Sequence, residues 1–347
     1  MKKTILLLLC LSYILQGKAE LSKTVNVTTP GSILTAVGND YVNVSNLTLT
    51  GTIDARDFKQ ISYYMSNLLV LDLSAVNIVA YTGTAGPMPG SNVYPINTIP
   101  KIALSPVAPN NYTAKLTSIT LPTNITCIDN QAFYGCSGLA TVVIPSTTIT
   151  TMVSGAFYGC SNLTSINIPS SVTSLGASLF FGCSKLTTIN IPSSVTSIGN
   201  AVLSGCTGLT TIYANSSTPV DLSSSTYAFS NVNKTTCTLH VPVGTKVAYQ
   251  AAVVWQDFFN IVEGITEILT LKSESIEFYP NPVLNGFRIK GFEGKARIDI
   301  TDLNGKVLLT KQVANNDFIS VNSLPGNLYF VKIITGNETI VKKLIKE

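Results

Sequence analysis

The chain has 347 residues, of which 22 are lysine or arginine and 18 are aspartate or glutamate, so its net charge is +4. Charged residues make up 12% of the chain and are almost absent from its centre, where no basic stripe exists that would favour a nucleic-acid-binding protein. The single histidine and the lack of a known catalytic motif also argue against an enzyme.

The N-terminus has the features of a secretory signal peptide. Two lysines precede an apolar run over residues 5–15, and small residues lie just before Glu20, where a signal peptidase would cut. The run is too short to cross a membrane. Cys10 lies inside the run and follows a leucine rather than a small residue, which disfavours a lipoprotein. We therefore expect residues 1–19 to be removed on export.

Residues 20–66 are predicted to cap the repeats that follow them. Asp54 and Asp57 lie three positions apart at the start of a predicted helix, where the first would cap the helix and the second would complete a capping box. A metal site or an acid pair is the alternative for these two carboxylates. Leucines spaced by two over residues 68–73 predict a first strand of the repeat type.

The centre of the chain repeats one pattern every 23 or 24 residues. Its first leucine recurs at equivalent positions, which are Leu116, Leu139, Leu163, Leu186 and Leu209. One such unit buries too little apolar surface to fold alone, whereas stacked copies form a continuous core. The period therefore predicts a solenoid.

Within each copy, two apolar residues two positions apart predict a short strand with one face inward. These pairs are Ile119/Leu121, Val142/Ile144, Ile166/Ile168 and Ile189/Ile191. A proline follows each pair and would end the strand, because proline lacks the N–H that a parallel ladder uses. Further on, a large apolar residue precedes a Gly-Cys pair, and we expect the glycine to turn the chain and the apolar residue to fill the core.

The alternating positions of these strands define a candidate binding face. Its outward residues are Ser118, Thr120, Thr141, Val143, Ser165, Asn167, Thr188, Asn190, Thr211 and Tyr213. They would stack into an uncharged surface rich in hydroxyls and amides, which a solenoid offers as an extended recognition surface. The alternative is that these residues are only solvated strand positions. A glycan ligand would favour exposed aromatic rings, for which Tyr213 is the clearest candidate.

Four of the seven cysteines occupy the same position of the repeat, namely Cys136, Cys160, Cys183 and Cys206. Parallel stacking does not easily give the dihedral angle that a disulfide requires, so we expect a buried, reduced cysteine ladder. The spacing lacks the close cysteine pairs of a zinc site. Whether Cys127 and Cys237 pair is left open.

The segment 231–264 is predicted to close the solenoid. Trp255, the only tryptophan, would seal the end of the core together with Phe258 and Phe259. His240 lies three residues after Cys237 in one predicted strand, so the two side chains would point to opposite faces and form no catalytic pair. A carboxylate pair assembled only by folding remains the open route to catalysis, from Asp40, Asp54, Asp57 or Asp72.

The last 71 residues, 277–347, predict a separate antiparallel β-sandwich after a linker at 265–276. Short alternating segments and turn residues follow one another, with a hairpin turn at Asn304 and Gly305. Four motifs occur in order: YPNP, DLNGK, SLPGNLYFVKI and a basic terminal strand. Their marker residues are Tyr279, Pro280, Asn281, Pro282, Asp302, Asn304, Gly305, Gly326, Tyr329, Lys342 and Lys343.

Both parts of the chain resemble known families. The repeats, with flanking segments over about residues 46–264, resemble the BspA-like leucine-rich-repeat proteins of bacterial surfaces. The four C-terminal motifs resemble the sorting domain of type IX secretion cargo in Bacteroidetes. The first resemblance implies a leucine-rich-repeat solenoid of short parallel strands, and the second implies export across the outer membrane through the type IX secretion machinery.

These expectations divide the chain into a signal peptide, a capping segment (20–66), repeats (67–230), a closing segment (231–264), a linker and a sorting domain (277–347). We expect a mainly β, secreted or surface-anchored protein without a cofactor, a metal, a nucleic-acid partner or a transmembrane segment. The BspA-like resemblance implies protein binding, specifically adhesion to host or neighbouring cells. A glycan-binding or structural envelope protein is the alternative.

Overall fold

The computed structural model describes residues 20–106, 115–144, 148–265, 277–279, 283–290, 295–301, 307–335 and 338–346. The predicted signal peptide lies outside the described residues, as does all of the predicted linker except its first residue. The chain divides into two compact units at Glu263 and Gly264. Each unit has its own apolar core, and the fold is mainly β, as predicted.

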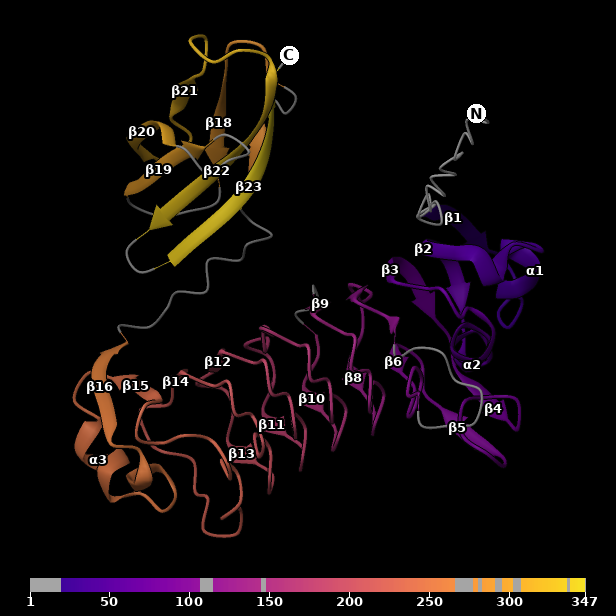
Figure 1. The fold of residues 1–347 in the computed structure, drawn as a ribbon, viewed down its shortest axis with the longest axis horizontal. Coiled ribbons are helices and arrows are strands. Elements are labelled where there is room, and N and C mark those ends of the chain that lie inside the picture. The colour runs from indigo at the N-terminus through magenta and orange to yellow at the C-terminus, as the bar shows by residue number, and fades with distance from the viewer. Residues whose placement is uncertain are drawn as a thin grey trace, which may run out of the picture. The chain divides into compact units, whose positions relative to one another are not determined.

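The repeat unit is a solenoid of stacked coils with parallel strands on one side (Figure 1). The first five of these strands form one sheet in the order β1 (Leu21–Val27), β2 (Val44–Ile53), β3 (Val70–Ile78), β7 (Ser118–Thr120) and β9 (Thr141–Val143). A second parallel sheet continues the face with β12 (Thr188–Ile191), β14 (Thr211–Ala214), β15 (Thr238–Pro242) and β16 (Asn260–Ile265).

The third copy departs from the prediction because residues 163–169 contain no strand. Ile166 and Ile168 are nevertheless buried, so the inward pattern of this copy is kept. The interval from Leu139 to Leu163 is 24 residues, whereas the other intervals are 23. The longer coil alone does not account for the missing strand, because β8 and β10 on the return side are also 24 residues apart and still pair in parallel.

The return side of the coils forms a further parallel sheet that the sequence did not indicate. Its two-residue strands are, in sheet order, β13 (Ser197–Ile198), β11 (Ser174–Leu175), β10 (Thr151–Met152), β8 (Cys127–Ile128) and β6 (Thr98–Ile99). In Figure 1 these strands run along the opposite side of the coils from β9, β12 and β14. Each strand buries its second residue, so the core lies between two ladders.

The glycine before each ladder cysteine turns the chain, as predicted. Gly135, Gly159, Gly182 and Gly205 have φ angles of 77°, 71°, 70° and 76°, which is the left-handed region that favours glycine. A Cβ added at Gly205 would lie 3.3 Å from the backbone nitrogen of Gly182, so the neighbouring coil leaves little room for a side chain.

The N-terminal segment is more than a cap, since β1 and β2 extend the strand face itself. Short helices connect its strands, namely α1 (Ile33–Val37), η1 (Tyr41–Asn43) and α2 (Ala55–Tyr64). Asp54 caps α2, and its capping box with Asp57 is present as predicted. After β3 the chain makes a small antiparallel hairpin, β4 (Tyr81–Gly83) and β5 (Asn92–Tyr94), before the first full repeat.

The closing segment contains α3 (Lys246–Ala251) and η3 (Trp255–Asp257). Trp255 and Phe258 are buried in the repeat core, as predicted. The prediction for Phe259 was wrong, because its side chain is 82% exposed. Neighbouring residues of an extended chain point to opposite sides, so Phe258 and Phe259 cannot both enter the core.

The C-terminal unit is an antiparallel β-sandwich. One sheet has the order β17 (Glu277–Tyr279), β18 (Gly286–Lys290) and β21 (Phe318–Ser320). The other sheet has the order β20 (Val307–Ala314), β19 (Lys295–Thr301), β22 (Asn327–Thr335) and β23 (Glu338–Lys346). No helix within the described residues has the length and apolar character that crossing a membrane requires.

Candidate functional site

The predicted face residues all point away from the core. None of the ten is buried, and Val143 is 44% exposed. Two rows run along the solenoid, because β7 pairs with β9 and β12 pairs with β14 in register. One row contains Ser118, Thr141, Ser165, Thr188 and Thr211, and the other contains Thr120, Val143, Asn167, Asn190 and Tyr213.

The hydroxyl groups of these rows are not used inside the protein. In the part of the chain that the structure describes, no side-chain hydrogen bond is made by Ser118, Thr120, Thr141, Ser165, Thr188 or Thr211. By contrast, neighbouring threonines just before the strands donate to carbonyl oxygens of the preceding strand-bearing coil: Thr117 to Leu69 at 2.9 Å and Thr210 to Thr187 at 3.1 Å. The hydroxyls on the face are therefore available to a ligand.

Tyr213 and His240 form an aromatic pair at one end of the second row. Their rings stack with centroids 4.7 Å apart, because β14 and β15 place the two residues side by side. Burial lowers the pKa of His240. One face of the Tyr213 ring is covered by His240, which leaves it less suited to stacking on a sugar than the sequence implied.

The amide beside this pair has a fixed orientation. Asn215 donates its side-chain Nδ2 to Oδ1 of Asn190 at 2.8 Å. The amide NH₂ of Asn190, which sits in register with Tyr213, is thus turned toward other acceptors. The Asn190 position is consequently a donor on the face.

One feature that the sequence pattern did not predict is an aromatic ladder at the corner of the coils. Tyr134 stacks on Tyr158 and Tyr158 stacks on Phe181, each with centroids 4.5 Å apart. These half-buried residues directly precede the Gly-Cys pair, so the repeated Tyr or Phe before that pair was the available signal. The rings cover one another's faces, which leaves mainly their edges to solvent.

The carboxylates considered for catalysis all have structural partners. Asp54 pairs with Arg56 at 2.6 Å, and Asp40 pairs with Lys23 at 3.4 Å. Asp57 is fully buried and accepts backbone N–H groups of Gly31, Ile33 and Asp54. Burial raises the pKa of Asp57. Asp57 therefore acts as a structural link between the loop before α1 and the start of α2.

Asp72 lies on β3 and is in register with Thr120 of the face. Its Oδ1 accepts the backbone N–H of Ser74 at 2.9 Å.

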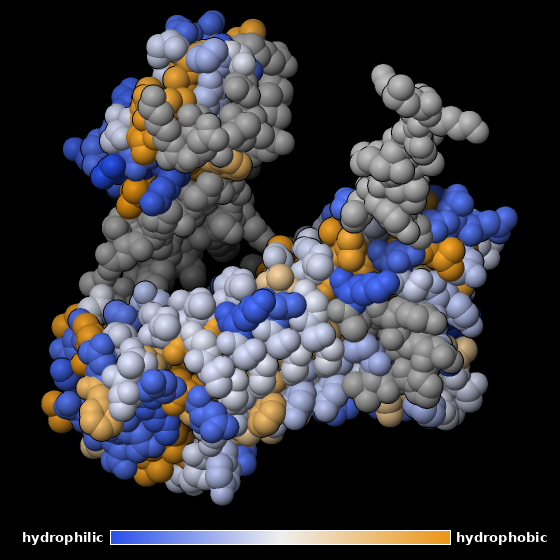
Figure 2. Space-filling model, in the orientation of Figure 1, coloured by the Kyte–Doolittle hydropathy of each residue, from blue (hydrophilic) through white to orange (hydrophobic). Residues whose placement is uncertain are grey.

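Among the described residues, no group of three or more histidine, cysteine, aspartate or glutamate side chains is placed to hold a metal ion. The surface seen in Figure 2 is mostly pale over the repeats, as expected for serine- and threonine-rich coils of intermediate hydropathy.

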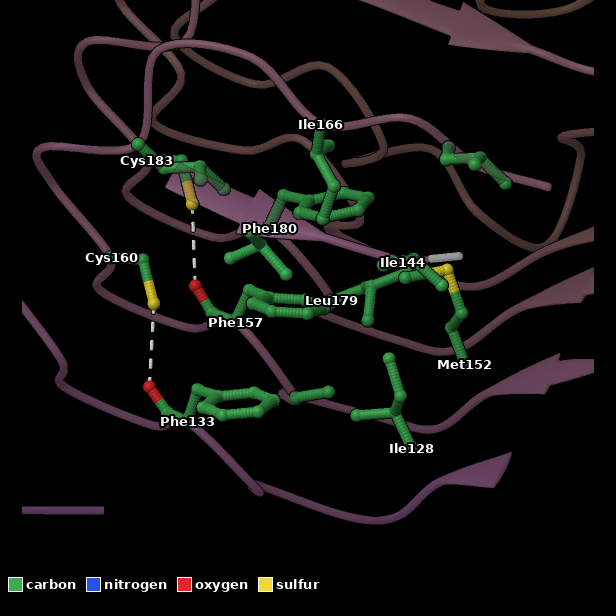
Figure 3. Packing of buried hydrophobic residues seen from close by; sticks show 14 of the residues in the cluster. Ile128, Phe133, Ile144, Met152, Phe157, Cys160, Ile166, Leu179, Phe180 and Cys183 are labelled. Carbon is green, nitrogen blue, oxygen red and sulfur yellow. Dashed lines mark hydrogen bonds between the residues drawn. The ribbon is translucent and has the colours of Figure 1, made fainter. Parts of the chain in front are cut away.

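The four ladder cysteines are buried, and none of them forms a disulfide. Each thiol donates to a backbone carbonyl oxygen of the preceding coil. Figure 3 shows these bonds for Cys160 and Cys183. Cys160 reaches Phe133 at 3.3 Å, Cys183 reaches Phe157 at 3.3 Å, and Cys206 reaches Phe180 at 3.1 Å. Burial raises the pKa of the Cys160, Cys183 and Cys206 thiols, to about 12 for Cys206. Cys127 and Cys237, whose pairing was open, are also unpaired.

Replacing Cys160 with serine is expected to lower the free energy of unfolding by about 1 to 3 kcal/mol, because a more polar hydroxyl would enter a fully buried site. Intact-mass analysis of unreduced protein, alkylated after unfolding, should find all four ladder thiols free. Two linked ladder cysteines, or a serine variant as stable as the parent, would contradict the ladder.

In the C-terminal unit, Tyr329 is buried and donates its hydroxyl to the carbonyl oxygen of Pro325 at 2.7 Å. Gly326 is exposed in the turn before β22. Tyr279 ends β17, and Lys342 and Lys343 lie in β23. The other sorting-motif residues lie outside the described residues, namely Pro280, Asn281, Pro282, Asp302, Asn304 and Gly305.

The geometry defines a repeat protein with an exposed strand face. Comparison with known families identifies the family of each of its two parts. The model of the BspA type leucine-rich repeat region matches residues 110–236 in six copies. The model of the secretion system C-terminal sorting domain matches residues 277–347. The chain thus combines a BspA-type leucine-rich-repeat region with a type IX sorting domain. It is an exported protein of the cell surface or the extracellular space, and its repeat region indicates a role in protein interaction.

Solved structures of leucine-rich-repeat proteins are similar to the chain at low identity. A leucine-rich repeat protein of T. pallidum has 21% identity and a TM-score of 0.35, over 47% of this chain and 64% of that one. A leucine-rich repeat protein of Bacteroides ovatus has 20% identity and a TM-score of 0.37, over 62% and 42%. The pneumococcal vaccine antigen PcpA has 16% identity and a TM-score of 0.37, over 64% and 62%.

The similar regions span less than two thirds of these three structures. Among curated proteins there is no match to the chain. The two matching family models describe a repeat scaffold and a sorting domain rather than a catalytic domain.

Proposed function

We propose that the exported chain is an adhesin whose strand face binds proteins on host or neighbouring-cell surfaces. The observation that carries this proposal is the set of unused hydroxyls on the face, next to threonines whose hydroxyls are bonded internally. Serine, threonine, asparagine and tyrosine are side chains that adapt to protein ligands, since they combine hydrogen bonding with a modest entropic cost.

A glycan-binding or structural envelope role is the second candidate. Hydroxyls and amides also suit sugars, and Asn190 presents amide donors beside Tyr213. The aromatic rings give a sugar less support, because His240 covers one face of Tyr213 and stacking at the corner covers both faces of Tyr158. Carbohydrate stacking requires a free ring face.

The test uses the mature full chain, from residue 20, on a panel of matrix proteins and on a glycan array. In parallel, adhesion to host cells and to other bacteria is compared between a strain with the protein and a strain without it. The proposal expects saturable binding to at least one protein and weaker adhesion of the strain without the chain. Binding to glycans alone, or equal adhesion of the two strains, would overturn it.

A further inference from the structure

The two rows of the strand face continue over β1, β2 and β3, which lie side by side at the indigo end of the solenoid (Figure 1). These strands pair in register with one another and with β7. They add Ser22, Asn46 and Val70 to the row of Ser118, and Thr24, Thr48 and Asp72 to the row of Thr120. At the other end, β15 adds Thr238 and His240. The face is therefore longer than the predicted set of residues.

Asp72 is the only aspartate, glutamate, lysine or arginine among the described residues in register with these rows. Thr48 and Thr120 lie on either side of it, each about 5 Å away, which is one strand spacing. Within the described part of the chain, neither threonine uses its hydroxyl in a hydrogen bond. The single carboxylate of the face thus lies between two unused hydroxyls.

A β-bulge beside Asp72 fixes the direction of its carboxylate. The register of β2 and β3 shifts after the pair of Thr48 and Asp72, so β3 has one residue more than β2 before Thr50 pairs with Ala75. Ser74 lies in this bulge and donates its backbone N–H to Oδ1 of Asp72. Bulges redirect side chains and are frequent next to functional sites. The second oxygen, Oδ2, has no partner among the described residues.

A ligand that covers Asp72 has to supply a positive charge. The ion pairs of the described residues use other carboxylates, so no lysine or arginine there neutralises Asp72. Its side chain is already half-buried, and contact with a protein would remove much of its remaining water. A carboxylate that loses water without gaining a cation weakens binding strongly. Neutral and acidic ligand surfaces are therefore rejected at this position.

We propose that Asp72 selects protein ligands that place a lysine or arginine side chain on the row between Thr48 and Thr120. This inference rests on the proposed function of the strand face and specifies the chemistry of its ligand. Oδ2 of Asp72 accepts one N–H of the cation, and the flanking hydroxyls accept others. Val70, two residues before Asp72 and 37% exposed, offers an apolar contact to the aliphatic part of the ligand side chain.

The test selects peptides from a random 12-residue library displayed on phage, with the mature full chain from residue 20 as the immobilised target. Peptides of the strand face are those that lose affinity for Thr141→Arg but not for Thr207→Arg, which carries the same charge outside the rows. We expect these peptides to be rich in lysine or arginine. For the most enriched peptide, replacing its basic residue with glutamine should raise the Kd for the parent at least about tenfold.

The same two peptides are then measured on variants of the chain. Asp72→Asn keeps the Oδ1 acceptor of the Ser74 N–H but removes the charge, whereas Thr120→Lys places a cation in register with Asp72 and leaves the bulge intact. In both variants the ratio of the two Kd values should fall to about twofold or less, because the coupled partner is lost. Melting temperatures equal to that of the parent confirm folding.

Asp221→Asn is the matched control. Asp221 accepts the backbone N–H of Ser223 at 2.9 Å, as Asp72 does from Ser74, but it is exposed in the loop between β14 and β15. This variant should keep the ratio of the parent. The inference is overturned if face peptides lack basic residues, or if Asp72→Asn and Thr120→Lys both keep the ratio. If no peptide loses affinity for Thr141→Arg, recognition by the strand face fails and this inference fails with it.

Discussion

Replacing Trp255 with alanine is expected to lower the free energy of unfolding of the repeat unit by about 3 to 5 kcal/mol. The indole is 1% exposed and packs against Phe229 and Tyr249, with ring centroids 5.1 Å and 5.5 Å away. Its Nε1 donates to the carbonyl oxygen of Val220 at 2.9 Å. The variant would therefore leave a cavity and an unpaired acceptor in the last part of the repeat core.

Chemical denaturation of the mature chain, monitored by circular dichroism, measures this loss. Phe259→Ala is the matched control, because this ring is 82% exposed and its removal should change stability by less than about 0.5 kcal/mol. Equal midpoints for the Trp255 variant and the parent would mean that the closing segment does not seal the core.

Replacing Phe157 with alanine is expected to cost about 3 to 5 kcal/mol as well. Phe157 is fully buried in the middle of a ring ladder, with centroids 5.1 Å from Phe133 and 5.7 Å from Phe180. Its carbonyl oxygen accepts the thiol of Cys183. Loss of the ring opens a cavity between two coils, and in a solenoid each coil depends on its direct neighbours.

The same denaturation experiment measures the Phe157 variant. Val143→Ala is its control, because Val143 is 44% exposed on the outer side of the strand of the same coil. We expect the control to stay within about 0.5 kcal/mol of the parent. A loss below about 1 kcal/mol for Phe157→Ala would show that the coils rearrange to fill the cavity.

The periodic part of the fold was predictable because the same pattern of apolar and turn residues recurs in each copy. The apolar pairs gave the inward face, and the Gly-Cys pair gave the turn, whose glycines have positive φ angles. The capping box of Asp54 and Asp57 was also readable, because its geometry depends only on local spacing.

Features that depend on contacts between coils were not predictable in this way. The return sheet consists of two-residue strands, which are too short to show an alternating pattern. The third copy has no strand although its apolar pair is buried like those of the other copies, so its own residues do not reveal the break. Phe258 and Phe259 are the same residue type, and only the backbone conformation decides which of the two rings enters the core.

For the candidate site, the sequence predicted which residues point outward but not how they are used. Only the structure shows that the hydroxyls of Thr117 and Thr210 are hydrogen-bonded to the preceding coil, whereas those on the face are not. The stacking of Tyr213 on His240 joins residues 27 positions apart, through β14 and β15. Both findings define which groups of the face a ligand can reach.

One comparison of two variants tests most directly whether the strand face binds the ligand. Thr141→Arg places a charge on the face, whereas Thr207→Arg places the same charge at an exposed corner of the repeats. With the ligand from the screen, we expect Thr141→Arg to raise the Kd at least about tenfold, since an unpaired charge in an uncharged interface is costly. Thr207→Arg should leave the Kd within about twofold. Equal affinities of both variants and the parent would contradict recognition by the strand face.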